Sequence, residues 1–93
     1  MTKFYSVKNR QDLLEAAIAS TPFLYRWLGI SVPLSRLDRE LGASRDWKNL
    51  RDSLRPTDKI WPFHFNKNTL AMRKGFLIVR DRKPFEAIVT ELS

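Results

Sequence analysis

The sequence is poor in the residues that build several classes of functional site. It holds no cysteine, one histidine and three glycines among its 93 residues. The lack of cysteine excludes a disulfide scaffold, a thiolate metal site and a cysteine nucleophile. One histidine, His64, excludes a histidine-rich metal site, and three isolated glycines exclude a phosphate-cradling loop. We therefore expect no metal and no cofactor.

Long apolar runs are also missing. No stretch approaches the roughly 20 apolar residues that span a membrane. The segment from Met1 to Tyr5 lacks the apolar run of a signal peptide. These features predict a cytoplasmic protein with no membrane partner. The length of 93 residues predicts a single domain, 1–93, with one modest core.

Patterns that would indicate catalysis are weak. The aspartates and glutamates are scattered among basic residues, with no pair that suggests an acid–base dyad. The serines lack the strand–turn–helix motif of a nucleophile elbow. No motif surrounds His64, and strand alternation suggests that it faces solvent. The sequence therefore predicts that the protein is not an enzyme.

Apolar residues at helical spacing occupy the first half of the chain. Leu13, Leu14 and Ala17 share one face of a helix that we expect to begin near the capping residue Asn9. Capping residues and helix breakers predict three further short helices. Their expected limits, caps included, are Thr21 to Gly29, Ser35 to Gly42 and Ser44 to Pro56.

The last third of the chain changes to strand periodicity. Residues 59–65 alternate, and residues 76–80 and 85–92 form two apolar runs around a turn at 81–84. Pro62 cannot donate to a strand ladder, which indicates that this strand lies at an edge or carries a bulge. We therefore predict an α+β fold in which short N-terminal helices precede an antiparallel sheet of about three strands. The sheet ends in a C-terminal hairpin, and the helices cover one face of it.

The aromatic residues of the first expected strand have two interpretations. Trp61, Phe63 and Phe65 fall on one side of the strand. The more ordinary interpretation places them in the core. If they were exposed, they could instead stack on the bases of a bound nucleic acid.

Positive charge is concentrated in one stretch. The net charge is +7, and residues 67–83 hold six basic residues against one acid. Such a cluster can bind phosphates and release counterions, or it can serve solubility and block association of sheet edges. The candidate polyanion-binding residues are Lys67, Arg73, Lys74, Arg80, Arg82 and Lys83.

Two nucleic-acid motifs fit only in part. Residues 35–54 resemble a helix-turn-helix, but Trp47 and Leu50 lie one residue out of register, and Asp38 stands where a small residue is usual. If this motif were used, Arg45, Lys48 and Arg51 would be its contacts. The run from Lys74 to Val79 overlaps the RNA-recognition strand pattern, yet it lacks the required aromatics.

The C-terminal half resembles a group of small uncharacterised bacterial proteins. Residues 54–63 read LRPTDKIWPF and are similar to their L-R-P-G-D-E-I/L-W-x-F stretch. Their later G-x-x-L-V-R and I-V-T segments look like residues 75–80 and 88–90. Thr57 replaces a glycine of the pattern, and Lys59 replaces an acid. The resemblance implies a bacterial or phage origin and a helix-then-sheet order, and it implies no activity.

Two functional hypotheses follow. The first is a non-catalytic module whose basic hairpin, residues 67–83, contacts nucleic acid or an acidic protein. The alternative is a protein-interaction subunit or homodimer, because the N-terminal region has more aromatics than a small core can hold. Those aromatics are Phe4, Tyr5, Phe23, Tyr25 and Trp27.

Overall fold

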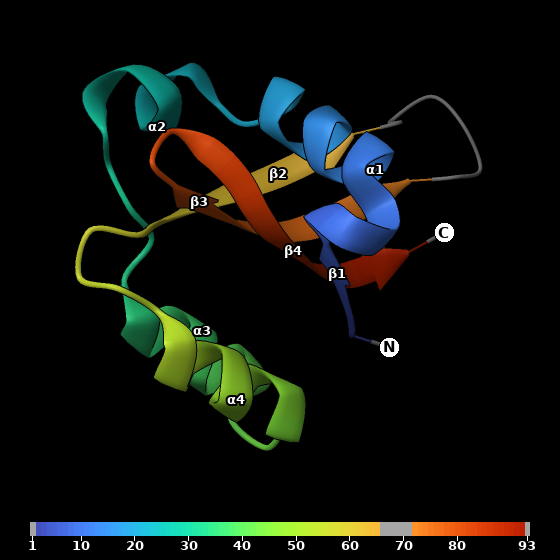
Figure 1. Cartoon of the computed structure of the whole chain (residues 1–93), viewed down its shortest axis with the longest axis vertical. Coiled ribbons are helices and arrows are strands. Elements are labelled where there is room, and N and C mark those ends of the chain that lie inside the picture. Colours follow the sequence, from blue (N-terminus) through green and yellow to red (C-terminus); the bar gives the residue numbers. More distant parts are fainter. Residues whose placement is uncertain (1, 66–71, 93) are drawn as a thin grey trace.

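The computed structural model describes residues 2–65 and 72–92, which form a single antiparallel sheet with helices packed against it (Figure 1). The strands lie in the order β1–β4–β3–β2. In chain order the elements are β1 (Lys3–Ser6), α1 (Val7–Ala19), α2 (Phe23–Leu28), α3 (Leu34–Leu41), α4 (Arg45–Ser53), β2 (Lys59–Phe65), β3 (Arg73–Arg80) and β4 (Lys83–Leu92).

The predicted α+β class with a C-terminal hairpin is confirmed. Strands β3 and β4 pair antiparallel and are joined at Asp81 and Arg82, so the turn is two residues shorter than expected. Both turn residues have left-handed φ angles, 53° and 66°. Two-residue hairpin turns use this conformation because its twist matches that of the strands. Lys83 and Pro84 therefore belong to β4.

The N-terminus departs from the expected order because a strand precedes the helices. Strand β1 pairs with β4, with Lys3 opposite Val89, and it makes the sheet four-stranded over the described residues. Its four residues are too few to show a period of two. Helix α1 also begins earlier than predicted, after Ser6. Asn9 lies in its first turn, where its side chain accepts a hydrogen bond from the Ser6 N–H at 2.8 Å.

Helices cover both faces of the sheet, whereas the sequence predicted one covered face. Figure 1 shows α1 on one side and the α3–α4 pair on the other. Strand alternation explains how the sheet serves two cores, because successive side chains point to opposite faces. The α1-side core contains Leu13, Leu14, Ala17, Trp61, Phe63, Leu77, Val79, Ala87 and Val89. The α3–α4-side core contains Val32, Leu37, Leu41, Trp47, Leu50, Ile60, Phe76, Ile78 and Ile88.

Strand β2 lies at an edge of the sheet, which is one of the two arrangements that Pro62 predicted. Part of its outer edge is occupied by the segment between α2 and α3. The Val32 N–H donates to the carbonyl oxygen of Ile60 at 2.8 Å, and the Ile60 N–H donates to Ser31 Oγ at 2.9 Å. These two bonds fix the end of the linker that leaves α2.

Gly75 lies where β4 approaches β3 most closely. The strand register shifts between Lys74 and Gly75, and a Cβ at Gly75 would collide with the carbonyl oxygen of Ile88. Only glycine fits this position without displacing the β4 backbone. The close approach of β4 therefore gives the glycine at this position a steric cause.

Candidate binding site

Helix α2 exposes most of its large apolar side chains. Phe23, Leu24, Trp27 and Leu28 are 65%, 56%, 73% and 66% exposed, and no residue of this helix is fully buried. The rings of Phe23 and Trp27 stack at 5.5 Å. We call these four side chains the α2 surface. Exposed apolar groups that are contiguous in this way mark interaction sites more often than isolated ones do.

The ends of α2 hold the helix in this orientation. Tyr25 is half-buried and packs against both cores, so it anchors the inner side of the helix. Gly29 ends the helix with a left-handed φ of 68°, and its N–H donates to the Tyr25 carbonyl at 3.2 Å. The remaining apolar residues consequently face outward. Figure 1 shows α2 at a corner of the molecule, beside the β3–β4 turn.

A pocket of about 750 Å³ lies between α2 and the turn end of the sheet. Its walls combine apolar side chains from several elements with charged side chains. The apolar wall consists of Ile18, Trp27, Trp61 and Val79, and the charged residues are Arg26, Lys59, Asp81 and Arg82. We call this cavity the α2 pocket. Three cations against one carboxylate make it electropositive.

Trp61, which lines the α2 pocket, has a buried hydrogen-bond donor without a partner in the described part of the chain. Trp61 is only 8% exposed, and its indole Nε1 is buried with no acceptor among residues 2–65 and 72–92. A buried N–H without a partner loses its hydration and gains nothing in return, which costs about 1–3 kcal/mol. Native folds rarely leave such a group without a reason.

The cations predicted to bind a polyanion do not lie together. Lys67 lies outside the described residues. Arg73 and Lys74 begin β3, whereas Arg80 ends it and Arg82 and Lys83 lie at the turn. The rise of an eight-residue strand separates these two groups by roughly 24 Å. The stretch that is continuous in sequence is therefore divided between opposite ends of the hairpin.

Arg80 is held inside the fold. It is 17% exposed and donates to both carboxylate oxygens of Asp58, at 3.0 and 2.8 Å. It also donates to the Ser53 carbonyl at 3.3 Å and lies 3.9 Å from the centre of the Phe85 ring. The hydrogen bonds from Arg80 lower the pKa of Asp58, and Asp58 raises the pKa of Arg80. This side chain ties the end of α4 to the sheet.

The other cations of the predicted set differ in their surroundings. Lys74 lies 3.6 Å from a carboxylate oxygen of Glu91. Arg82 and Lys83 are exposed, and within the described ranges neither has a carboxylate within 4.0 Å. Of these, Arg82 lines the α2 pocket. The predicted set therefore contributes one cation to that pocket.

The aromatic residues of β2 belong mainly to the core. Trp61 and Phe63 are buried, and Phe65 is half-buried with its ring 5.8 Å from that of Phe63. The core interpretation is therefore confirmed for Trp61 and Phe63. His64 is exposed, as the strand alternation predicted.

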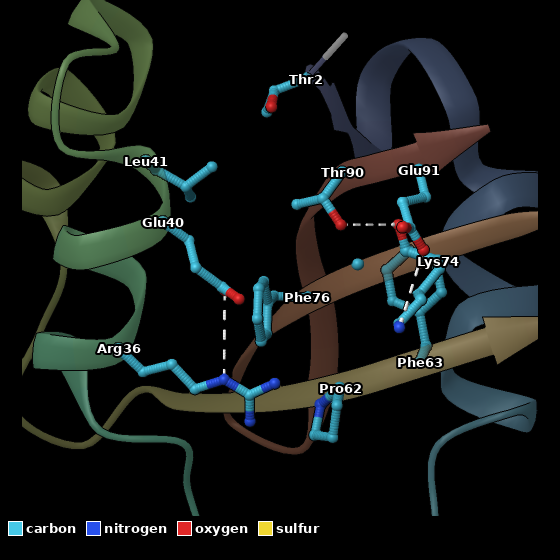
Figure 2. Close-up of a pocket in the computed structure, with 11 residues that line it drawn as sticks. Thr2, Arg36, Glu40, Leu41, Pro62, Phe63, Lys74, Phe76, Thr90 and Glu91 are labelled. Carbon is cyan, nitrogen blue, oxygen red and sulfur yellow. Dashed lines mark hydrogen bonds and ion pairs between the residues drawn. The ribbon is translucent and has the colours of Figure 1, made fainter.

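A second pocket, of about 370 Å³, lies between α3 and the opposite end of the sheet (Figure 2). Arg36 lies 4.0 Å from Glu40 and 5.2 Å from the centre of the Phe76 ring. Lys74 and Glu91 form the facing pair. Each cation of this pocket already has a carboxylate partner. The second pocket therefore has no net charge with which to attract an ion.

The α3–α4 pair explains why the helix-turn-helix spacing fails. Trp47 is buried against the sheet, and its Nε1 donates to Asp38 Oδ1 at 2.9 Å. Arg51 lies 3.4 Å from the other oxygen of Asp38. Asp38 is thus a hydrogen-bond acceptor at the helix contact, where the motif would need a small residue. The apolar face of α4 is directed to the sheet by Trp47 and Leu50.

Sequence analysis did not single out Leu24, Leu28, Arg26 or Lys59 as site residues. A signal was present, because five of the six residues in FLYRWL are apolar. Among the described residues, the side of this helix that carries Tyr25 meets the cores, and its other apolar side chains are exposed. The excess of N-terminal aromatics pointed to the same region.

Among the described residues, no group of three or more histidine, aspartate or glutamate side chains could hold a metal ion. No helix in this part of the chain is long and apolar enough to cross a membrane.

Comparisons with protein-family models, with curated proteins and with solved structures found no match for this chain. The resemblance of residues 47–93 to small bacterial proteins therefore stays a prediction.

Proposed function

We propose that this protein is a non-catalytic interaction module that docks a partner protein on the α2 surface. The observation that carries the proposal is the exposure of Phe23, Leu24, Trp27 and Leu28 on one short helix. Burying apolar surface contributes about 25 cal/mol per Å². Tryptophan and arginine are enriched among the residues that dominate interface energies, and α2 offers Trp27 with Arg26 beside it.

The charge around α2 selects the kind of partner. Arg26, Lys59 and Arg82 border the α2 pocket, and the whole chain carries a net charge of +7. A second copy would bring the same positive charge to the interface, and like charges placed together oppose association. The partner that fits is a segment with apolar residues flanked by acidic ones.

A designed peptide pair tests this proposal. One amphipathic peptide carries leucines with glutamates, and the other carries the same leucines with lysines. We expect the acidic peptide to bind, and we expect the double change Trp27→Ala with Leu28→Ala to lower its affinity at least tenfold. Val7→Ala is the matched control, because Val7 is exposed at the start of α1, outside the α2 surface. Nuclear magnetic resonance titration gives both the affinity and the residues contacted.

Three results would contradict the proposal. The first is equal binding of the acidic and basic peptides. The second is a molecular mass of the wild-type protein that rises with protein concentration, while that of Trp27→Ala stays at the monomer value. A second copy of the chain would then be the partner on the α2 surface. The third is binding to anionic lipid vesicles, but not to the acidic peptide, with the same dependence on Trp27.

Binding of a polyanion at the β3–β4 turn is the second candidate function. It is favoured by Arg82 and Lys83, which are exposed with no carboxylate within 4.0 Å in the described part of the chain. Mixed DNA and RNA oligonucleotides would then bind with an affinity that falls steeply as salt rises. Reversing both charges, Arg82→Glu with Lys83→Glu, would abolish this binding. Nucleic-acid affinity that ignores the reversal argues against a site at the turn.

A further inference from the structure

We propose that the α2 pocket binds a small amphipathic carboxylate. The apolar body of the ligand lies along Trp27 and Trp61, and its carboxylate meets the cations at the pocket margin. The proposal rests on the pocket and does not require a partner protein. Phe23, Leu24 and Leu28 do not line this cavity, so docking on the α2 surface and filling of the pocket are separable.

The size and lining of the pocket suit a small organic ligand. Its volume of about 750 Å³ lies within the range of roughly 300–1,000 Å³ that ligand sites occupy. Ile18 and Val79 extend the apolar wall that the two tryptophans begin. An aliphatic or aromatic body placed there would cover Trp27, which is 73% exposed in the free protein.

The charges of the pocket specify an anion. The pocket is lined by three cations, Arg26, Lys59 and Arg82, and by one carboxylate, Asp81. None of the three cations forms an ion pair within 4.0 Å among the described residues. A bound carboxylate therefore displaces no existing partner. The planar guanidinium of arginine also matches the two oxygens of a carboxylate.

The second pocket supports this assignment by contrast. In Figure 2 the guanidinium of Arg36 already meets Glu40, and Lys74 already meets Glu91. An anion entering there would have to compete with a carboxylate of the protein. Of these two pockets, the α2 pocket is the one whose cations form no ion pair within 4.0 Å among residues 2–65 and 72–92.

The indole of Trp61 is a further feature of this site. Its Nε1 is buried and has no acceptor among residues 2–65 and 72–92, and other atoms of the residue line the pocket. An oxygen of a ligand can accept from this donor once the side chains that cover Nε1 move. Trp47 differs, because its indole N–H is satisfied by Asp38 at 2.9 Å on the opposite face of the sheet.

The three indole N–H groups provide a direct test. The 15N-labelled protein is titrated with octanoate, and the indole resonances are followed by nuclear magnetic resonance. We expect the signals of Trp27 and Trp61 to shift in a saturable way and the signal of Trp47 to stay in place. Octan-1-ol and octylammonium, which have the same chain without the negative charge, should bind at least tenfold more weakly.

A charge-reversal pair locates the anion. Arg82→Glu removes a cation that lines the pocket, and Lys83→Glu makes the same change at the next residue, which does not line it. We expect the first change to weaken octanoate binding at least tenfold and the second less than twofold. An unshifted Trp47 signal verifies that each variant is folded.

The proposal is overturned if octan-1-ol or octylammonium binds as tightly as octanoate, or if the two reversals have equal effects. It is also overturned if millimolar octanoate leaves the Trp27 and Trp61 signals in place. Peptide docking is tested separately, with the acidic peptide as the probe. Its variant includes Leu28→Ala, and Leu28 does not line the α2 pocket.

Discussion

Helices α4 and α2 are both short, and each carries a tryptophan and a leucine, yet the fold treats them in opposite ways. Trp47 of α4 is 1% exposed, whereas Trp27 of α2 is 73% exposed. The indole N–H of Trp47 has an acceptor in Asp38, and Arg80 ties the Ser53 carbonyl at the end of α4 to the sheet. In the described part of the chain, Tyr25 is the α2 residue that packs against the two cores. Apolar side chains on a short helix therefore do not by themselves show whether the protein's own core covers them.

The largest expected effect is on the α4 side of this comparison. Trp47→Ala removes a fully buried ring and the indole donor to Asp38, so we expect a loss of about 3–5 kcal/mol in the free energy of unfolding. Urea denaturation measures it. Trp47→Phe keeps most of the ring volume and should lose less. A loss below about 1 kcal/mol for the alanine variant would show that α4 is not part of the cooperative core.

The second-largest effect is expected at the ion pair of Arg80 with Asp58, since Arg80 also joins the end of α4 to the sheet. Asp58→Asn removes the charge partner of Arg80, so the free energy of unfolding at neutral pH should fall, by less than in Trp47→Ala. The pKa of Asp58 is lowered in the folded state, so its contribution is present above the ordinary carboxyl pKa of 3.8. The contribution is lost as the pH falls below 3.8 toward the lowered folded pKa.

Unfolding measured at several pH values checks this pH dependence. The difference between the wild-type protein and Asp58→Asn should shrink below pH 3.8, where the unfolded carboxyl takes up its proton. A difference that stays constant down to pH 2 would contradict the assignment of the effect to Asp58.

A smaller effect is expected at the end of α2. Gly29→Ala places a Cβ in open space but at a left-handed φ of 68°, which costs roughly 1 kcal/mol. Gly29→Asn is the matched control, because asparagine tolerates this conformation better. Thermal unfolding of the two variants measures the difference. Equal stability of the alanine variant and the wild-type protein would indicate that the end of α2 is free to rearrange.

The smallest effect is expected at the centre of the α2 surface. Trp27→Ala removes a ring that is mostly in water, so the free energy of unfolding should change by less than about 0.5 kcal/mol. The same change should weaken binding of the acidic peptide, and adding Leu28→Ala should weaken it further, to at least tenfold. A loss of stability comparable to that of Trp47→Ala would remove the difference between the two helices, and with it the case for a docking surface.

Part of the candidate site could be predicted from the sequence. The excess of aromatics near the N-terminus pointed to Phe23 and Trp27, and both are exposed on α2. The charge cluster pointed to Arg82, which lines the α2 pocket. Arg26 and Lys59 were missed, because they meet Arg82 only through the packing of α2 against the sheet end.

Local chemistry alone determined several features of this protein. Alternation predicted a strand over residues 59–65, and Pro62 indicated that this strand lies at an edge or carries a bulge. Ser44 marked the start of α4, where its side chain accepts a hydrogen bond from the Trp47 N–H at 3.2 Å. These are interactions between residues close in sequence or limits set by a single side chain. They can therefore be inferred without knowing the fold.

Tertiary structure alone decided the rest. The pairing of β1 with β4 added a strand whose four residues are too few to show strand periodicity. Helices pack on both faces of the sheet and form two separate cores. The basic residues of 67–83 that the structure describes lie at opposite ends of the extended hairpin. Arg80 is paired with Asp58, 22 residues away in the chain, and is not available to a ligand. Burial, pairing and charge compensation depend on contacts between distant segments, and no local pattern encodes which segments meet.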